Sequence, residues 1–176
     1  GVILSDHSFE DSGIKSLSVT DLTSIGDYAF QNTLNLEDVQ IKSGTDVALG
    51  SKSFLKSAVK TMTFNGVTSV GENAFQNCPN GPETVEFTED GVTLAEYAFE
   101  DSGVVNVTTA DGATISQIKS KAFYSTKNLD TVEISGTGVI LSDHSFEDSG
   151  IKSLSVTDLT SIGDYAFQNT LNLEDV

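Results

Sequence analysis

The sequence predicts a repeat solenoid, a mainly β chain in which each coil contributes a parallel strand and short helical turns. Residues 1–39 recur letter for letter as residues 138–176, an offset of 137 residues. Within this block, a phenylalanine preceded by Ala or Ser returns every 21 to 24 residues. Periods of about 20 to 50 residues are typical of solenoids, so we expect residues 1–176 to form a single array of coils. The repeating phenylalanines are Phe9, Phe30, Phe54, Phe75, Phe99, Phe123, Phe146 and Phe167.

Each coil has the same internal pattern around its phenylalanine. Gly is frequent four positions before it, where we expect a sharp turn, and a small residue stands three positions after it. An alternating run follows, such as Leu17 and Val19, and its period of two predicts a strand whose apolar side chains point inward. Several strands end at glycine turns such as Asn65-Gly66 and Asp90-Gly91. A coil of this length leaves room for a second short extended segment and at most a turn or two of helix.

The charge of the chain excludes several classes of partner. The sequence has 26 acidic residues against nine lysines, has no arginine, and carries a formal net charge of -17. Binding to nucleic acid or to anionic membrane surfaces requires clustered basic residues, so neither is expected. No stretch approaches the roughly 18 apolar residues of a membrane span, and membrane insertion is not expected. Cys78 is the only cysteine, so no disulfide can form within the chain.

The phrase around the phenylalanine identifies a family resemblance. Residues 24–39 read S-I-G-D-Y-A-F-Q-N-T-L-N-L-E-D-V, and residues 69–78 read S-V-G-E-N-A-F-Q-N-C. This resembles the BspA-type leucine-rich repeat, whose phrase is an aliphatic residue, Gly, two variable residues, Ala-Phe, two variable residues and Cys. The resemblance covers all eight coils, although seven of the eight Cys positions hold Ser or Thr, which are also small.

This resemblance implies a right-handed solenoid of the kind found in large bacterial surface proteins and in some protist ones, often linked with adhesion to host proteins or other cells. We therefore expect an extracellular or cell-surface location. The chain begins at Gly1 without a signal segment, so we interpret it as a fragment or a processed product, with signal and anchor outside it.

No residue pattern predicts catalysis, a cofactor site or a metal site. His7 and His144 fill the same position in two copies, about six coils or roughly 29 Å apart, too far to share an ion. Acidic pairs such as Glu10-Asp11 could collect calcium, but the known calcium-loop motifs are absent. Cys78 has no histidine in a neighbouring coil and is interpreted as a buried small residue. Asn106-Val107-Thr108 matches a glycosylation sequon, with Val107 expected to point inward.

The outward residues of the predicted strands form the candidate binding face. Because alternate side chains of a strand point to opposite sides, stacking should align them into one polar strip without aromatic or Arg anchors. The strip consists of Ser18, Asp38, Gln40, Thr61, Thr63, Thr84, Glu86, Asn106, Thr108, Thr131 and Glu133.

Three functions follow from this pattern, in order of preference. The first is a cell-surface interaction or adhesion module whose strip contacts a host protein, a glycan or a cell. The second is a structural spacer or stalk built of tandem blocks. A calcium-binding module is the remote third. Val39 and its copy Val176 fall inside a predicted strand without a polar cap, so end-to-end self-association is also expected.

Overall fold

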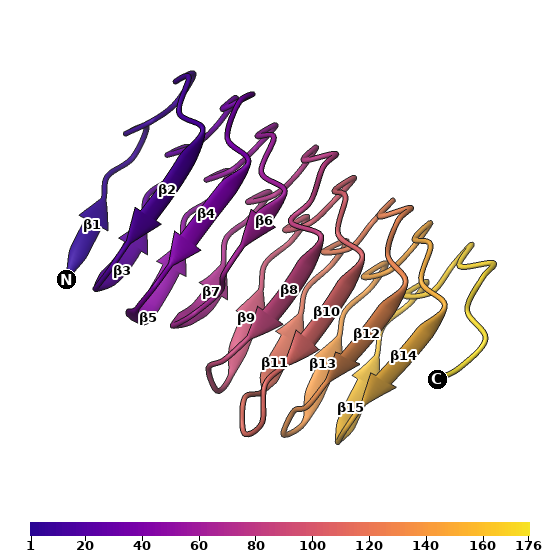
Figure 1. Ribbon diagram of the computed structural model, residues 1–176. Helices are drawn as coiled ribbons and strands as arrows, with labels where there is room; N and C mark the ends of the chain where they lie inside the picture. Colours follow the sequence, from indigo (N-terminus) through magenta and orange to yellow (C-terminus); the bar gives the residue numbers. More distant parts are fainter.

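The computed structural model describes residues 1–176 as a parallel β solenoid without helices (Figure 1). Seven coils contribute two strands each and an eighth contributes one, and the two termini lie at opposite ends of the stack. Strands of neighbouring coils pair in parallel with their counterparts, except at one junction on one side of the solenoid. The predicted solenoid with parallel strands in each coil is therefore confirmed.

One side of the solenoid is a continuous sheet of eight strands. In order these are β1 (Val2–Leu4), β3 (Leu22–Ile25), β5 (Gly44–Leu49), β7 (Val67–Val70), β9 (Val92–Leu94), β11 (Ile115–Ile118), β13 (Val139–Leu141) and β15 (Leu159–Ile162).

The other side carries the strands predicted from the period of two, divided between two sheets. The first sheet contains β2 (Ser16–Val19), β4 (Asp38–Ile41) and β6 (Thr61–Met62). The second contains β8 (Thr84–Phe87), β10 (Asn106–Thr109), β12 (Thr131–Ile134) and β14 (Ser153–Val156). The inward and outward alternation is as predicted: Val39 and Ile41 are fully buried, while Asp38 and Gln40 between them are partly exposed.

A stack of phenylalanines closes the core at the turn that joins the two sides. The rings of successive coils are nearly parallel, with centroids 4.9 to 5.3 Å apart and interplanar angles of 4 to 8°. Parallel strands are spaced by about 4.8 Å, so one aromatic ring per coil forms an offset stack. Together with the strands, these rings form one hydrophobic core of 38 buried residues.

The expectation of short helical turns is wrong. In the segment around each phenylalanine, alternate backbone N–H groups donate hydrogen bonds to the next coil and not to carbonyls of the same segment. The N–H groups of His7, Phe9 and Asp11 donate to the carbonyls of Asp27, Ala29 and Gln31 in the following coil. Only the intervening N–H groups close local turns, as from Glu10 to the carbonyl of His7. An α-helix would need every N–H to bond within the segment. We call this third parallel ladder the turn ladder.

Left-handed backbone conformations maintain the turn ladder. The residues two before and two after each stacked phenylalanine, at the −2 and +2 positions, all have φ between 50° and 59°. This conformation costs an L-residue roughly 1 kcal/mol, and Asn and Asp tolerate it best. Six of the eight +2 positions hold Asn or Asp, whereas only one −2 position does, namely Asn73. The −2 residues are His7, Tyr28, Lys52, Asn73, Tyr97, Lys121, His144 and Tyr165.

The glycines four positions before the phenylalanine, expected at sharp turns, allow neighbouring coils to pack closely. Gly50 and Gly71 do not have positive φ, but a Cβ on Gly71 would come within 2.6 Å of the carbonyl carbon of Gly50. The absence of a side chain therefore lets two coils approach closely. The glycine turns at the other end of the coil do use left-handed geometry, with φ of 79° at Gly66 and 69° at Gly91.

The coils alternate between two kinds. In coils 1, 3, 5 and 7 the inward pair of the eight-stranded sheet is two residues apart, as in Val47 and Leu49; in the other coils it is three apart, as in Val67 and Val70. The loop between the turn ladder and the second strand is longer in the even coils, as at residues 78–84 against 57–61. The structural unit is thus a pair of coils, and three pairs make the 137-residue block.

Replacing Phe99 with Ala should lower the free energy of unfolding by about 3 to 5 kcal/mol, because it empties a large site in the middle of the stack. Phe99 is fully buried between Phe75 and Phe123. Leu34→Ala is the control, since Leu34 is 71% exposed, and it should change little. Denaturant unfolding measures both, and a loss below about 1 kcal/mol at Phe99 would show that the stack is not part of the core.

Replacing Lys56 with Asn should stabilise the protein by about 0.5 to 1 kcal/mol, because Lys56 has a φ of 57° and an exposed side chain. Asn fits this backbone with less strain and already occupies other +2 positions. Lys42→Asn, at a position with ordinary φ, is the matched control and should bring no gain in melting temperature. Equal effects of the two changes would contradict the assigned strain.

Candidate interaction surfaces

The candidate strip predicted from the sequence lies on one side of the solenoid, but it is interrupted. All of its members are partly or fully exposed. Strand pairing aligns Ser18 with Gln40, and Thr108 with Glu86 and Glu133. A second row aligns Asp38 with Thr61, and Asn106 with Thr84 and Thr131. The structure therefore brings these residues together in two groups, one on each sheet.

The break lies between β6 and β8, which do not pair as strands. A single bridge between Phe64 and Phe87 joins the two sheets there. Both aromatic side chains point into the core and meet edge to face, with centroids 5.3 Å apart, and Pro82 supplies no N–H just before β8. A hollow of about 190 Å³ opens at the break, with Met62 and Phe64 among its lining residues and Thr63, Thr84 and Glu86 beside them.

Sequence reasoning missed a second surface, formed by the side chains of the turn ladder. We call it the turn edge and define it as the residues at the −3, −2, +1 and +2 positions of every coil. All four tyrosines and both histidines of the chain lie on it. Apart from Asn73, none of its residues is buried. The repeat itself was the available signal, because these positions stand at fixed offsets from the phenylalanine.

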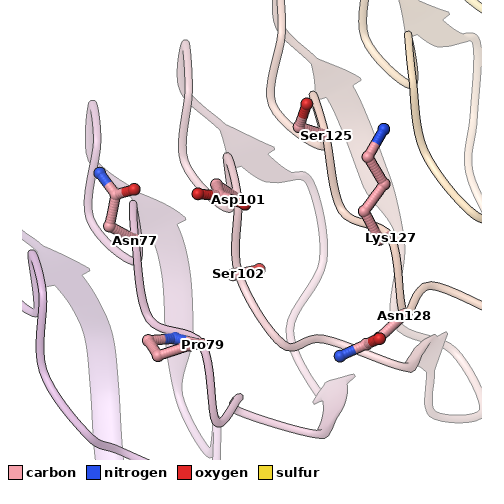
Figure 2. Close-up of a pocket in the computed structure, with 7 residues that line it drawn as sticks. All are labelled: Asn77, Pro79, Asp101, Ser102, Ser125, Lys127 and Asn128. Carbon is pink, nitrogen blue, oxygen red and sulfur yellow. The ribbon is translucent and has the colours of Figure 1, made fainter.

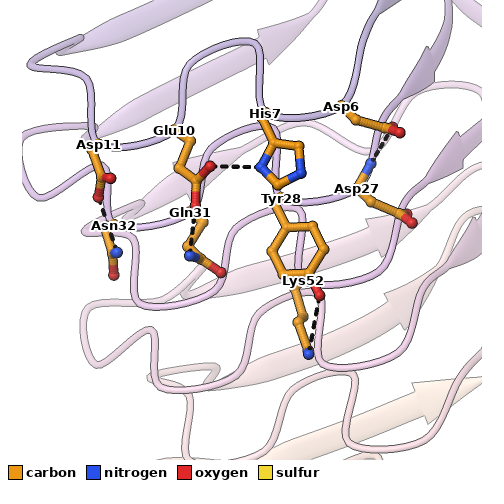
Figure 3. A network of polar contacts seen from close by, with 9 residues as sticks. All are labelled: Asp6, His7, Glu10, Asp11, Asp27, Tyr28, Gln31, Asn32 and Lys52. Atoms are coloured by element: carbon orange, nitrogen blue, oxygen red, sulfur yellow. Dashed lines mark hydrogen bonds and ion pairs between the residues drawn. The ribbon is translucent and has the colours of Figure 1, made fainter.

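The aromatic side chains of the turn edge stack between neighbouring coils. His7 lies parallel to Tyr28 at 4.9 Å between ring centroids, and the ammonium of Lys52 lies 5.2 Å from the Tyr28 ring on its other side (Figure 3). Farther along, the Lys121 ammonium lies 5.7 Å from the Tyr97 ring and 5.3 Å from the Tyr124 ring. These contacts fix the orientation of the rings, and Lys52 also donates a hydrogen bond to the Tyr28 hydroxyl at 3.2 Å, while Tyr28, Tyr97 and Tyr124 remain partly exposed.

Polar contacts of the turn edge also run from coil to coil. Glu10 accepts hydrogen bonds from His7 at 2.6 Å and from Gln31 at 2.8 Å. Asp6 accepts one from the backbone N–H of Asp27, and Asn32 donates to Asp11 at 3.0 Å (Figure 3). These contacts hold the side chains that make them in place without a partner.

The turn edge concentrates the negative charge of the protein. It holds twelve of the 26 acidic residues and three of the nine lysines. The strip on the strand side holds only Asp38, Glu86 and Glu133 as charged residues. The two surfaces therefore differ in both aromatic content and charge.

A polar hollow of about 320 Å³ lies beside the turn edge, above coil 5 (Figure 2). It lies between the longer loops of coils 4 and 6, which carry Pro79 and Asn128, and no hydrophobic side chain lines it. Ser102 also lines it. This residue is buried, and its hydroxyl has no hydrogen-bond partner, as is true of Ser12 and Ser149 at the same position of other coils. Asp101, Ser125 and Lys127 supply charged and hydroxyl groups around it.

The side chains that could bind a metal ion do not cluster. The structure contains no group of three or more His, Cys, Asp or Glu that could hold a metal ion. His144 pairs with Glu147 at 2.7 Å, as its copy His7 pairs with Glu10.

In the glycosylation sequon, Val107 is fully buried and Asn106 is partly exposed. None of the elements is a helix of the length and apolar character that crossing a membrane requires.

Cys78 lies in the core, as interpreted from its position in the repeat. Its Sγ is fully buried, donates to the carbonyl of Phe54 at 2.9 Å and lies 3.7 Å from the Ser57 hydroxyl. Burial raises the pKa of the Cys78 thiol to about 12, although the Ser57 hydrogen bond acts in the opposite direction. The thiolate that would act as a nucleophile is therefore unavailable near neutral pH.

The paired strands, phenylalanine stack and turn ladder define the class of protein as a leucine-rich repeat solenoid. A family model for the BspA-type leucine-rich repeat region, with six copies, matches residues 2–111 and 47–174. The chain belongs to this family.

Two solved structures are similar to the chain. A leucine-rich repeat protein from Bacteroides ovatus is 15% identical, with a TM-score of 0.37, over 99% of this chain and 70% of that one. The pneumococcal vaccine antigen PcpA is 14% identical, with a TM-score of 0.40, over 96% of this chain and 58% of its own. The chain thus spans little more than half the length of PcpA. A search of curated proteins finds no significant match.

Cys78 should resist thiol reagents in the folded protein and react fully once the protein unfolds. Its ionisation is suppressed below about pH 12, so labelling of the folded protein should be far slower than that of a free thiol at every pH between 7 and 9. Because the pKa is raised on folding, its contribution to stability is present below the thiol pKa of the unfolded chain and is lost as the pH rises toward 12. Rapid labelling at neutral pH, measured by mass spectrometry, would contradict this burial.

Proposed function

We propose that this chain is a cell-surface interaction module that binds a basic protein partner through the turn edge. The observation that carries the proposal is the gathering of all four tyrosines among twelve acidic residues on this one surface. Leucine-rich repeat domains typically bind proteins, and the resemblance to surface proteins linked with adhesion supports an extracellular or cell-surface location.

Tyrosine supplies the anchor that the strand strip lacks. Tyr, Trp and Arg dominate binding hot spots, because they bury a large area and keep a polar group for hydrogen bonding. The chain has no Trp and no Arg, so its tyrosines are the remaining residues of this kind. Tyr28 and Tyr97 are partly exposed and are already oriented by contacts with His7, Lys52 and Lys121. Ordered side chains lose less conformational entropy on binding.

Charge sets the chemistry of the partner. The excess of carboxylates on the turn edge attracts Lys-rich or Arg-rich segments and accelerates encounter at low salt. A guanidinium or ammonium group can also contact a tyrosine ring. Many weak copies along the array would add avidity, since each coil repeats the same geometry.

The strand strip is the second candidate surface for the same function. Its members Thr84, Asn106 and Thr131 align across β8, β10 and β12, and Glu86, Thr108 and Glu133 form the parallel row. It is polar and without aromatic anchors, and its continuity is lost at β6. A partner on this side would bind weakly, and the hollow beside Met62 is the place where apolar groups lie nearest to its surface.

A glycan partner would suit the hollow above coil 5. Sugar hydroxyls need hydroxyl, amide and carboxylate partners, and Asn77, Asp101, Ser102 and Asn128 present this set around one concave site.

A structural spacer is the remaining candidate function, and the geometry of the repeated block supports it. The two copies of residues 1–39 pair with the same register: Leu4 with Ile25, and Leu141 with Ile162. Tandem blocks therefore extend the array without altering its geometry, and a stalk needs no more than that.

The test is binding of the 176-residue chain to an immobilised array of synthetic peptides that range from acidic to basic. Basic peptides should bind, and added salt should weaken the binding because exposed charges are screened. The double variant Tyr28→Ser and Tyr97→Ser should lower the affinity about tenfold or more.

The matched control is Glu86→Lys with Glu133→Lys, which adds positive charge to the strand strip and leaves the turn edge intact. It should preserve most of the binding, with a melting temperature within a few degrees. If this control abolishes binding while the tyrosine variant does not, the strand strip is the site. If no basic peptide binds, the turn edge is not an interaction surface and the spacer function is favoured.

A further inference from the structure

The chemistry of the turn edge repeats every three coils. Coils 1 and 2 carry four acidic residues and no lysine on this edge, and coils 4 and 5 again carry four acidic residues and no lysine. Coils 3 and 6, which follow these pairs, carry lysine and no acidic residue there. We call the two acidic pairs of coils the acidic bands. The acidic residues of the first band are Asp6, Glu10, Asp11 and Asp27, and those of the second are Glu72, Glu96, Glu100 and Asp101.

Each acidic band holds a tyrosine at the same place. Tyr28 and Tyr97 occupy the −2 positions of coils 2 and 5, and a lysine occupies the −2 position of the coil that follows each. The Lys52 ammonium lies 5.2 Å from the Tyr28 ring, and the Lys121 ammonium lies 5.7 Å from the Tyr97 ring (Figure 3 shows the first pair). Coils 1–3 and coils 4–6 differ in sequence, so the repeated unit is one of side-chain contacts as well as charge.

Packing of the coils does not impose the three-coil period. The packing positions alternate every two coils instead: the small residue three positions after the phenylalanine is Ser in odd coils and Thr or Cys in even coils. A two-coil core and a three-coil edge return to the same phase after six coils, which is the content of the 137-residue block. The outward rows of the strand strip do not share the period, since Ser18, Gln40 and Thr63 are followed by Glu86, Thr108 and Glu133.

The large side chains of the three-coil unit are held in an unfavourable backbone conformation. Tyr28, Lys52, Tyr97 and Lys121 all have φ of 56° or 57°. Asn tolerates this conformation better and occupies the same position in coil 4, as Asn73. Tyrosine and lysine are therefore kept where they strain the backbone and add nothing to the core, a combination that points to binding.

The three-coil period sets a distance. Coils are spaced by about 4.8 Å, so equivalent points of successive acidic bands lie about 14 Å apart along the edge. An extended peptide rises by about 3.3 Å per residue, so about four of its residues span this distance. The lysine coil between the bands places Lys52 and the exposed Lys56 opposite the middle of each such span.

We propose that the turn edge reads the spacing of basic residues in its partner, an extended segment in which pairs of Lys or Arg recur about every four residues. The basic pairs lie on the acidic bands, and neutral residues lie opposite the lysine coils. A uniformly basic segment has to place cations beside Lys52 and Lys56, and this repulsion selects against it. The inference rests on the proposed function, because it specifies which basic partner the turn edge takes.

The test compares three synthetic peptides, each made of six lysines and six serines, for binding to the 176-residue chain by fluorescence polarisation at low salt. In the paired peptide two lysines alternate with two serines, in the alternating peptide single residues alternate, and in the block peptide the six lysines are contiguous. Composition and charge are equal, so only spacing differs. The paired peptide should bind about threefold or more tightly than either of the others, because its ion pairs form without facing a lysine.

Ser51→Glu combined with Lys56→Asp makes coil 3 acidic and joins the two bands, while the contact of Lys52 with Tyr28 remains. All three peptides should then bind more tightly, and the preference for the paired peptide should fall below about twofold. Lys42→Asp combined with Thr45→Glu is the matched control, because it changes the charge equally at exposed positions away from the turn edge. This control should keep the preference, and circular dichroism melting verifies that both variants fold.

The outcomes separate this inference from the proposed function. Equal binding of the three peptides to the original chain overturns the spacing rule and leaves the turn edge as a surface for basic partners. A preference that persists in the Ser51 and Lys56 variant also overturns it, because the lysine coil then has no part in selection. Binding of none of the peptides overturns the proposed function and the spacing rule together.

Discussion

Backbone hydrogen bonding from each coil to the next is the constraint on which the rest of the structure depends. Three parallel ladders, two of strands and one of turns, hold successive coils in register. Such pairing spaces the coils by about 4.8 Å and fixes which residues of successive coils stack on one another. A residue at a given position of the repeat therefore lies directly above its counterpart in the next coil, as Phe54 lies above Phe30.

This constraint acts on the surface as strongly as on the core. The ladder that stacks phenylalanine inside also stacks His7 on Tyr28 outside and places Lys52 over the same ring. The residues that do so sit in left-handed backbone conformations, which large side chains occupy at a cost. At the +2 position the chain relieves this cost with Asn and Asp, while at the −2 position it retains Tyr, His and Lys. The −2 side chains are thus the places where backbone strain and an ordered aromatic surface coincide, a combination that is often found at functional sites.

Much of the fold could be read from periodicity alone. The return of phenylalanine and the alternation of residues such as Val39 and Ile41 depend only on local geometry and burial, so the coils, the strands and the core were predictable. The helical turns were predicted wrongly, because the choice between bonding within a segment and bonding to the next coil depends on a neighbour about 21 residues away. The break in the strand strip escaped prediction for a similar reason, since it lies where Phe64 and Phe87 of two neighbouring coils meet.

The candidate surface shows the same division. Which residues point outward from the strands followed from the sequence, because alternation is a property of one strand. That Tyr28, Tyr97, Tyr124 and Tyr165 share one edge is implicit in their fixed offsets from the phenylalanine, but that this edge is an ordered surface followed from tertiary structure, because the contacts that orient its side chains run between coils. The sequence by itself determined the repeat, the buried faces and the charge. Only the stacking of coils decided which polar and aromatic side chains form a common surface, since that surface exists between coils and not within any one of them.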